Sequence, residues 1–126
     1  MNESNVSPAV LERLRAICLA LPEAKEQPAH GDPSWRIRKK IFAAQKGNYD
    51  GGRPSVWMKA PDGAQAALMA ADPELFFSPP YVGHKGWLGV WLDVELDWDE
   101  LEELVRDSYR LVAPKKLAKL LEDDDE

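Results

Sequence analysis

The sequence lacks the features that mark several classes of protein. It has one cysteine, Cys18, in 126 residues, which excludes an intramolecular disulfide. Its longest apolar runs, Ala16–Leu21 and Ala66–Ala71, have six residues each, whereas a membrane-spanning helix needs about 20. The N-terminus is polar and acidic and does not resemble a signal peptide. We therefore expect a cytoplasmic protein that does not interact with a membrane.

Residues that carry catalysis or bind metals are also scarce. The two histidines, His30 and His84, are far apart in the sequence, and Cys18 falls on the apolar face of a predicted helix, where a buried and inert thiol is expected. These residues do not have zinc-ligand spacing. The sequence contains no glycine-rich phosphate loop and no recognisable nucleophile–base pattern. We expect no metal site and no cofactor, and a binding protein is favoured over an enzyme.

Charge is distributed unevenly along the chain. The net charge is −6, yet residues 36–59 carry seven basic residues and one acidic residue, and the last five residues are all acidic. A basic segment of this kind either binds an anion or protects the edge of a sheet from pairing with another chain. The candidate contacts to nucleic acid in this segment are Arg36, Arg38, Lys39, Lys40, Lys46 and Arg53.

Local patterns predict helices at both ends of the chain. Ser7 and Pro8 have the form of an N-cap followed by proline at the first helical position, and apolar residues then recur at helical spacing as far as Leu21. The run Asp97–Glu100 is a capping box, which predicts the start of a second amphipathic helix. This helix should end before Pro114, and a short helix is expected over 114–121.

Between these helices the pattern predicts strands over 26–30, 34–37, 40–45 and 55–59, a helix over 61–71 and a strand over 87–94. Two of the strands form a hairpin around Arg38 and Lys39. Strands joined by hairpins form antiparallel sheets, so we expect an α+β domain with two layers and with the helices packed on one face. The domain should span residues 1–121, and residues 122–126 should be a disordered acidic tail.

The segment Phe76–Trp91 is unusually constrained, because it contains two prolines, three glycines and five aromatic residues. It forms either a structural corner or part of a site. Together with the turn around His30 it defines a second candidate site, in which the histidines bind an anion or transfer protons, or only hold their turns in place. The residues of this candidate site are His30, Asp32, Trp35, Tyr81, His84 and Lys85.

Several motifs resemble those of the MmcQ/YjbR family. They lie at His30–Trp35, Lys40–Ala43, Val56–Lys59, Pro79–Trp87 and Asp97–Leu101, and the resemblance covers about residues 8–118. It implies an α-β(3)-α-β(2)-α fold similar to that of secretion chaperones. The function of the family is largely unknown, and a "double wing" DNA-binding role has been predicted for it. Members often have glycines at the hairpin turn, where this chain has Arg38 and Lys39.

Three functions remain open at this point. The first is weak binding of nucleic acid through the basic hairpin, with Trp35, Trp57 and Trp87 nearby to stack on bases, although the acidic net charge opposes it. The second is an adaptor that binds a protein or peptide, or forms a homodimer. The third is a small-molecule site or an enzyme around His30 and His84.

Overall fold

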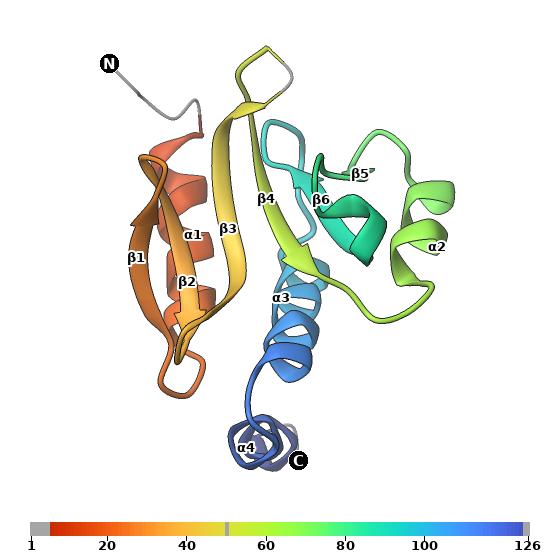
Figure 1. The fold of residues 1–126 in the computed structure, drawn as a ribbon. Coiled ribbons are helices and arrows are strands. Elements are labelled where there is room, and N and C mark those ends of the chain that lie inside the picture. The colour runs from red at the N-terminus through yellow and green to blue at the C-terminus, as the bar shows by residue number, and fades with distance from the viewer. Residues whose placement is uncertain (1–5, 50, 125–126) are drawn as a thin grey trace.

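A six-stranded antiparallel sheet organises the protein, whose computed structural model describes residues 6–49 and 51–124 (Figure 1). The strand order is β1-β2-β3-β4-β6-β5, and every neighbouring pair is antiparallel. The predicted α+β architecture with an antiparallel sheet is confirmed. The strands are β1 (Lys25–Ala29), β2 (Asp32–Ile37), β3 (Lys40–Tyr49), β4 (Arg53–Lys59), β5 (Phe76–Phe77) and β6 (Trp87–Trp91).

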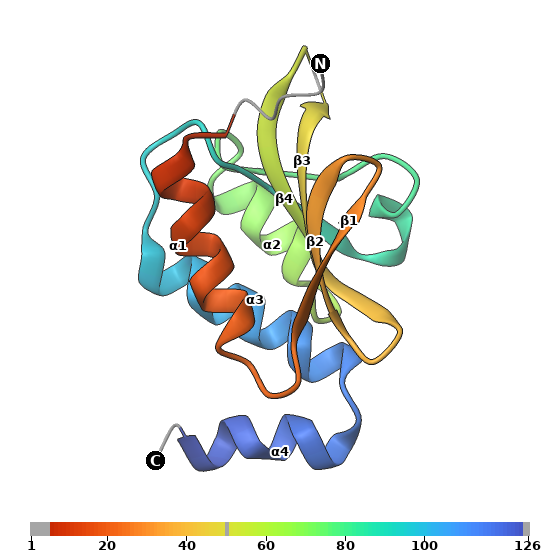
Figure 2. The ribbon, with the colours of Figure 1, turned by 90° about the vertical axis from the view of Figure 1, so that its left-hand side faces the viewer.

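The helices leave one face of the sheet open. Helices α1 (Pro8–Leu19) and α3 (Trp98–Val112) lie across one face, α2 (Ala64–Ala71) packs beside β5, and α4 (Lys115–Asp124) crosses beyond the end of α3 (Figures 1 and 2). In the part of the chain that the structure describes, no α-helix lies across the opposite face, which we call the open face. The loop over residues 78–86, which contains the 3-10 turn η1 (Gly83–Lys85), lies over part of it.

Alternation along the strands assigns each side chain to one face of the sheet. Trp35, Met58 and Leu88 are connected through cross-strand pairs and are completely buried beneath the helices. The residues next to Met58 and Leu88 in the sequence, Trp57 and Trp87, therefore lie on the open face, where both are half-buried. The tryptophans of the sheet thus divide between the core and the open surface.

A β-bulge in β3 lets α3 dock onto the sheet. The register between β2 and β3 shifts beside Trp35, and Phe42 is the extra residue. The Phe42 ring meets the Tyr109 ring edge to face, with ring centroids 5.4 Å apart. The hydroxyl of Ser108 donates to the carbonyl oxygen of Phe42 at 2.6 Å and accepts from the backbone N–H of Lys59 at 2.9 Å. Helix α3 therefore bridges β3 and β4 beside the bulge, at the end of their ladder that is marked by the Ala43–Met58 pair.

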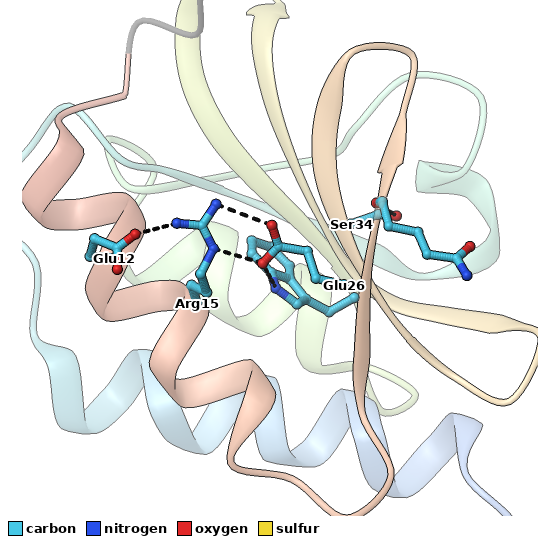
Figure 3. Close-up of polar contacts among 6 residues, drawn as sticks. Glu12, Arg15, Glu26 and Ser34 are labelled. Atoms are coloured by element: carbon cyan, nitrogen blue, oxygen red, sulfur yellow. Dashed lines mark hydrogen bonds and ion pairs between the residues drawn. The ribbon is translucent and has the colours of Figure 1, made fainter.

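A network of polar contacts joins α1 to the edge strand β1 (Figure 3). Arg15 donates from Nε to Glu26 Oε1 at 2.7 Å and from Nη2 to Glu26 Oε2 at 3.1 Å, and it also pairs with Glu12. The indole of Trp35 donates to Glu26 Oε1 at 2.9 Å. The hydrogen bond from Arg15 is the largest of the causes that lower the pKa of Glu26. These contacts connect the helix layer to the covered face of β1 and β2.

Several details differ from the prediction. Four strands precede α2, as the strand pattern predicted, whereas the family resemblance implied three; the first of the four, β1, forms a hairpin with β2. Helix α2 begins at Ala64 because Gly63 has a left-handed backbone with φ 83°. Helix α4 continues through residues 122–124, which were expected to be a disordered tail, and residues 125–126 lie outside the described residues. Within residues 6–49 and 51–124, no helix is both long and apolar enough to cross a membrane.

Replacing Glu26 with glutamine should lower the free energy of unfolding at pH 7 by about 1–3 kcal/mol, because the guanidinium of Arg15 then stays partly buried without its carboxylate. The pKa of folded Glu26 lies below its usual value near 4.5, so the stability it contributes is present above that pH and is lost as the pH falls below it. The deficit of the variant in urea unfolding should therefore shrink as the pH falls below this value.

The matched control is Glu12→Gln, which removes an Arg15 partner whose side chain is 71% exposed. This control should change the free energy of unfolding by less than about 1 kcal/mol. An equal effect of the two substitutions, or a Glu26→Gln deficit that does not vary with pH, would contradict the assigned role of Glu26.

Candidate functional site

One row of residues crosses the open face near the β2–β3 hairpin. Lys25 pairs with Arg36, Arg36 with Ile41, and Lys59 with Trp87, while β3 and β4 are neighbours. Paired residues project to the same face, so apolar Ile41 lies between the basic residues of β2 and β4. Two strand spacings separate Arg36 from Lys59, or about 10 Å between backbones. Their long side chains can therefore reach a single anion above Ile41.

This part of the open face is hollowed. Arg36, Ile41, Lys59 and Trp87 line a hollow of about 490 Å³, and we call it the basic hollow. Its remaining walls come from the hairpin, from the 78–86 loop and from α3, which supply Lys39, Lys40, Val82 and Val112. The basic hairpin and the proline-rich loop, which are far apart in the sequence, thus meet at one surface.

The four cations of the basic hollow have no acidic partner among the residues that the structure describes. In addition, the Nε of Arg36 is shielded from solvent and, within the same residues, has no hydrogen-bond partner. Unpaired cations around a concave surface produce a local positive potential even in a protein whose net charge is −6. The arrangement is suited to an anionic ligand.

Three of the six predicted nucleic-acid contacts, Arg36, Lys39 and Lys40, line the basic hollow. Two others form ion pairs elsewhere: Arg38 donates to Glu23 at 2.9 Å and Arg53 donates to Asp93 at 2.8 Å. The sixth, Lys46, lies over the ring of Trp57 at 5.3 Å from the centroid. The predicted set is therefore distributed along the whole open face and the hairpin tip.

Lys59 belongs to the basic hollow, but it was not among the predicted contacts. Alternation along β4 carries the signal that would have found it, because Lys59 and Trp57 are two residues apart and share a face. The predicted set ended at Arg53, the first residue of β4, and did not include Lys59 at the other end of this strand.

Aromatic side chains continue the open face beyond the hollow. Phe77 stacks on Trp91 with ring centroids 4.1 Å apart, and the guanidinium of Arg53 lies 3.9 Å from the Trp91 centroid. Trp57 on β4 carries Lys46 above its ring. Basic and aromatic side chains are therefore combined over β4 and β6, which suits a ligand that has both anionic groups and rings.

Three residues of the histidine-centred candidate site, which come from the β1–β2 hairpin, make contacts that stabilise the fold. His30 and Gly31 form the β1–β2 turn, with φ values of 55° and 89°, as in a type I′ hairpin, and His30 is exposed. Asp32 is buried and accepts from the backbone N–H of Gly47 at 3.3 Å. Trp35 lies in the core on the opposite face. These three predicted residues shape the first hairpins.

The other three residues of the histidine-centred candidate site lie on the 78–86 loop. Tyr81 is 89% exposed and has a left-handed backbone with φ 68°, and His84 and Lys85 in η1 are exposed as well. The β1–β2 turn and η1 are separated by at least three strand spacings, or about 15 Å. The structure therefore does not bring His30 and His84 together.

Gln65 anchors the loop that forms one wall of the basic hollow. Its Nε2 donates to the carbonyl oxygens of Gly83 at 2.8 Å and Trp87 at 2.5 Å. A Cβ at Gly83 would lie 2.1 Å from the Ser78 hydroxyl oxygen, so glycine is required for this close packing. Sequence reasoning did not single out Gln65, although it is the one amide in an otherwise apolar helix, α2.

The described residues contain no group of three or more histidine, cysteine, aspartate or glutamate side chains placed to hold a metal ion. Large exposed apolar side chains come from five separate segments and do not gather on one element. They are Leu19, Tyr81, Val94, Leu111 and Leu120.

Replacing Gln65 with leucine should release the 78–86 loop, because two partly buried carbonyl groups lose their donor. We expect a stability loss of about 1–3 kcal/mol and faster amide hydrogen exchange confined to residues 82–87. The matched control is Gln27→Leu on the exposed edge strand β1, for which the exchange of this loop should not change. Equal amide exchange rates for residues 82–87 in the two variants would contradict the anchoring role of Gln65.

The comparisons with known proteins agree with this architecture. A model of the YjbR family matches residues 19–111, a range that includes the hairpin, the 78–86 loop and the whole basic hollow except Val112. The fold is similar to that in the crystal structure of a Deinococcus radiodurans protein with the domain DUF419, with a TM-score of 0.70 and 23% identity over 81% of this chain and 77% of that chain. No curated protein matches the sequence. Because the family model spans most of the sheet and reaches into α3, the chain belongs to the YjbR family, whose function is unknown.

Proposed function

We propose that the protein binds nucleic acid weakly and without catalysis, with the open face of the sheet as its contact surface and the basic hollow as the centre of that surface. The observation that carries the proposal is the group of four basic side chains, Arg36, Lys39, Lys40 and Lys59, which have no acidic partner within the described residues. Contacts from such side chains to phosphates supply most of the affinity in non-specific nucleic-acid binding.

The aromatic side chains favour a single strand over a duplex. Trp57 pairs with Gly89, two residues from Trp87, so the two tryptophans form a diagonal pair about 7–8 Å apart on the open face. Successive unpaired bases stack on aromatic rings of this kind, whereas the bases of a duplex are already stacked on one another. Lys46 lies over Trp57 and adds a cation next to one of the rings.

The proposal relocates the contact surface within the basic segment. The hairpin tip contributes less than its charge implies, since Arg38 is paired with Glu23. Lys39 and Lys40 instead line the hollow together with Arg36 of β2 and Lys59 of β4. The two other functions have weaker support: the histidines of the candidate small-molecule site are separated, and the exposed apolar residues of a candidate adaptor surface lie on different segments.

A fluorescent single-stranded oligonucleotide of about 20 nucleotides tests the proposal by anisotropy titration over a range of salt concentrations. Four phosphate contacts predict a slope of about −3 for log K against log salt concentration. The double variant Lys39→Ala/Lys40→Ala should bind several-fold more weakly and reduce the steepness of the slope by about 1.4, because two contacts are removed.

The control is Lys116→Ala/Lys119→Ala, which removes the same charge from exposed positions of α4 outside the hollow. Its affinity and slope should stay close to those of the unmodified protein. Absence of binding at low salt, or an equal loss in both double variants, would show that the open face is not a nucleic-acid surface.

A further inference from the structure

Arg36 is the residue of the basic hollow that has an unsatisfied hydrogen-bond donor. Its Nε–H is shielded from water and has no hydrogen-bond partner within the described residues, although the side chain lines the hollow. A shielded donor without an acceptor is costly, and a guanidinium pairs best with an oxyanion that offers two oxygens at once. A phosphate group matches this requirement, and a single-atom acceptor such as a hydroxyl does not.

The positive charge around the basic hollow is larger than the charge of one internal phosphate of a strand. Four cations, those of Arg36, Lys39, Lys40 and Lys59, line a space of about 490 Å³. A phosphodiester in a strand carries one negative charge, whereas a terminal phosphate carries about 1.5 to 2 at pH 7 and has three free oxygens. The concentration of charge therefore fits a phosphomonoester better than the backbone of a strand.

The apolar lining indicates what the phosphate is attached to. Trp87 lies one strand beyond Lys59 in the same row, which is about 5 Å, so a ring joined to the phosphate through a sugar can rest against the indole. Val82 and Val112 form the walls at this end of the sheet. Along β4 the open face continues from Lys59 to Trp57, about 7 Å away, where the next base of a strand can stack.

We infer that the basic hollow binds a phosphomonoester carried by a nucleoside, either as a mononucleotide or as the 5′-phosphorylated end of a single strand. The inference rests on the proposed function and deepens it, because it assigns the centre of the surface to a terminal phosphate. Arg36 holds the phosphate with two donors, Lys39, Lys40 and Lys59 neutralise its charge, and Trp87 contacts the first base.

Calorimetric titration of the full chain with four probes tests this inference. The probes are a six-nucleotide DNA strand with a 5′-phosphate, the same strand with a 5′-hydroxyl, deoxythymidine monophosphate and inorganic phosphate. We expect the 5′-phosphate to raise the affinity for the strand at least fivefold and the mononucleotide to bind more tightly than inorganic phosphate. In the variant Arg36→Lys, which keeps the charge and loses the planar pair of donors, the affinity for the 5′-phosphorylated strand should fall by more than that for the 5′-hydroxyl strand, so that the advantage of the 5′-phosphate disappears.

Because a change at Arg36 also affects the sheet, Lys59→Gln provides a second variant, and it should reduce the advantage of the 5′-phosphate by at least half. The two strands separate this inference from the proposed function. Equal affinity for both strands overturns the inference and leaves nucleic-acid binding in place, whereas absence of binding by both strands overturns the proposed function. Equal affinity for inorganic phosphate and the mononucleotide would overturn the contact between Trp87 and the base.

Discussion

The hydroxyl of Ser108 holds the two layers of the protein in register. It bridges the carbonyl of Phe42 and the N–H of Lys59 at the bulge, and the next residue, Tyr109, donates to the carbonyl of Pro22 at 2.6 Å. These contacts seat α3 on one face of the sheet, and no α-helix of the described residues lies across the opposite face. The following turn of α3 then emerges as a wall of the basic hollow. The position of one helix therefore determines both the core and the candidate site.

Local sequence patterns predicted the helices and strands well, because capping residues and hydrophobic periodicity act over a few neighbouring residues. The capping box before α3 is confirmed, since Asp97 accepts from the backbone N–H groups of Asp99 and Glu100. The candidate site was harder to predict because it depends on contacts between distant segments. The row through Arg36 and Lys59 depends on a register that the bulge shifts, and no periodicity in the sequence reveals a single extra residue.

Charge segregation explains how an acidic protein presents a basic surface. Three arginines outside the hollow meet carboxylates from other segments, in the pairs Arg15–Glu26, Arg38–Glu23 and Arg53–Asp93. Helix α4 begins beside the hairpin with Lys115, and Glu122 lies about 10 Å farther along its axis (Figure 2). The described part of this helix therefore runs away from the basic hollow.

The central claim is that the open face, and not the helix-covered side, contacts the ligand. The indole N–H signals in a nitrogen–proton correlation spectrum test it most directly, because the tryptophans lie on both sides of the sheet. Adding a single-stranded oligonucleotide should shift the signals of Trp57 and Trp87, while those of buried Trp35 and of Trp98, which contacts Arg13 on the helix side, should stay in place. A shift of Trp98 without any change at Trp57 and Trp87 would contradict the account.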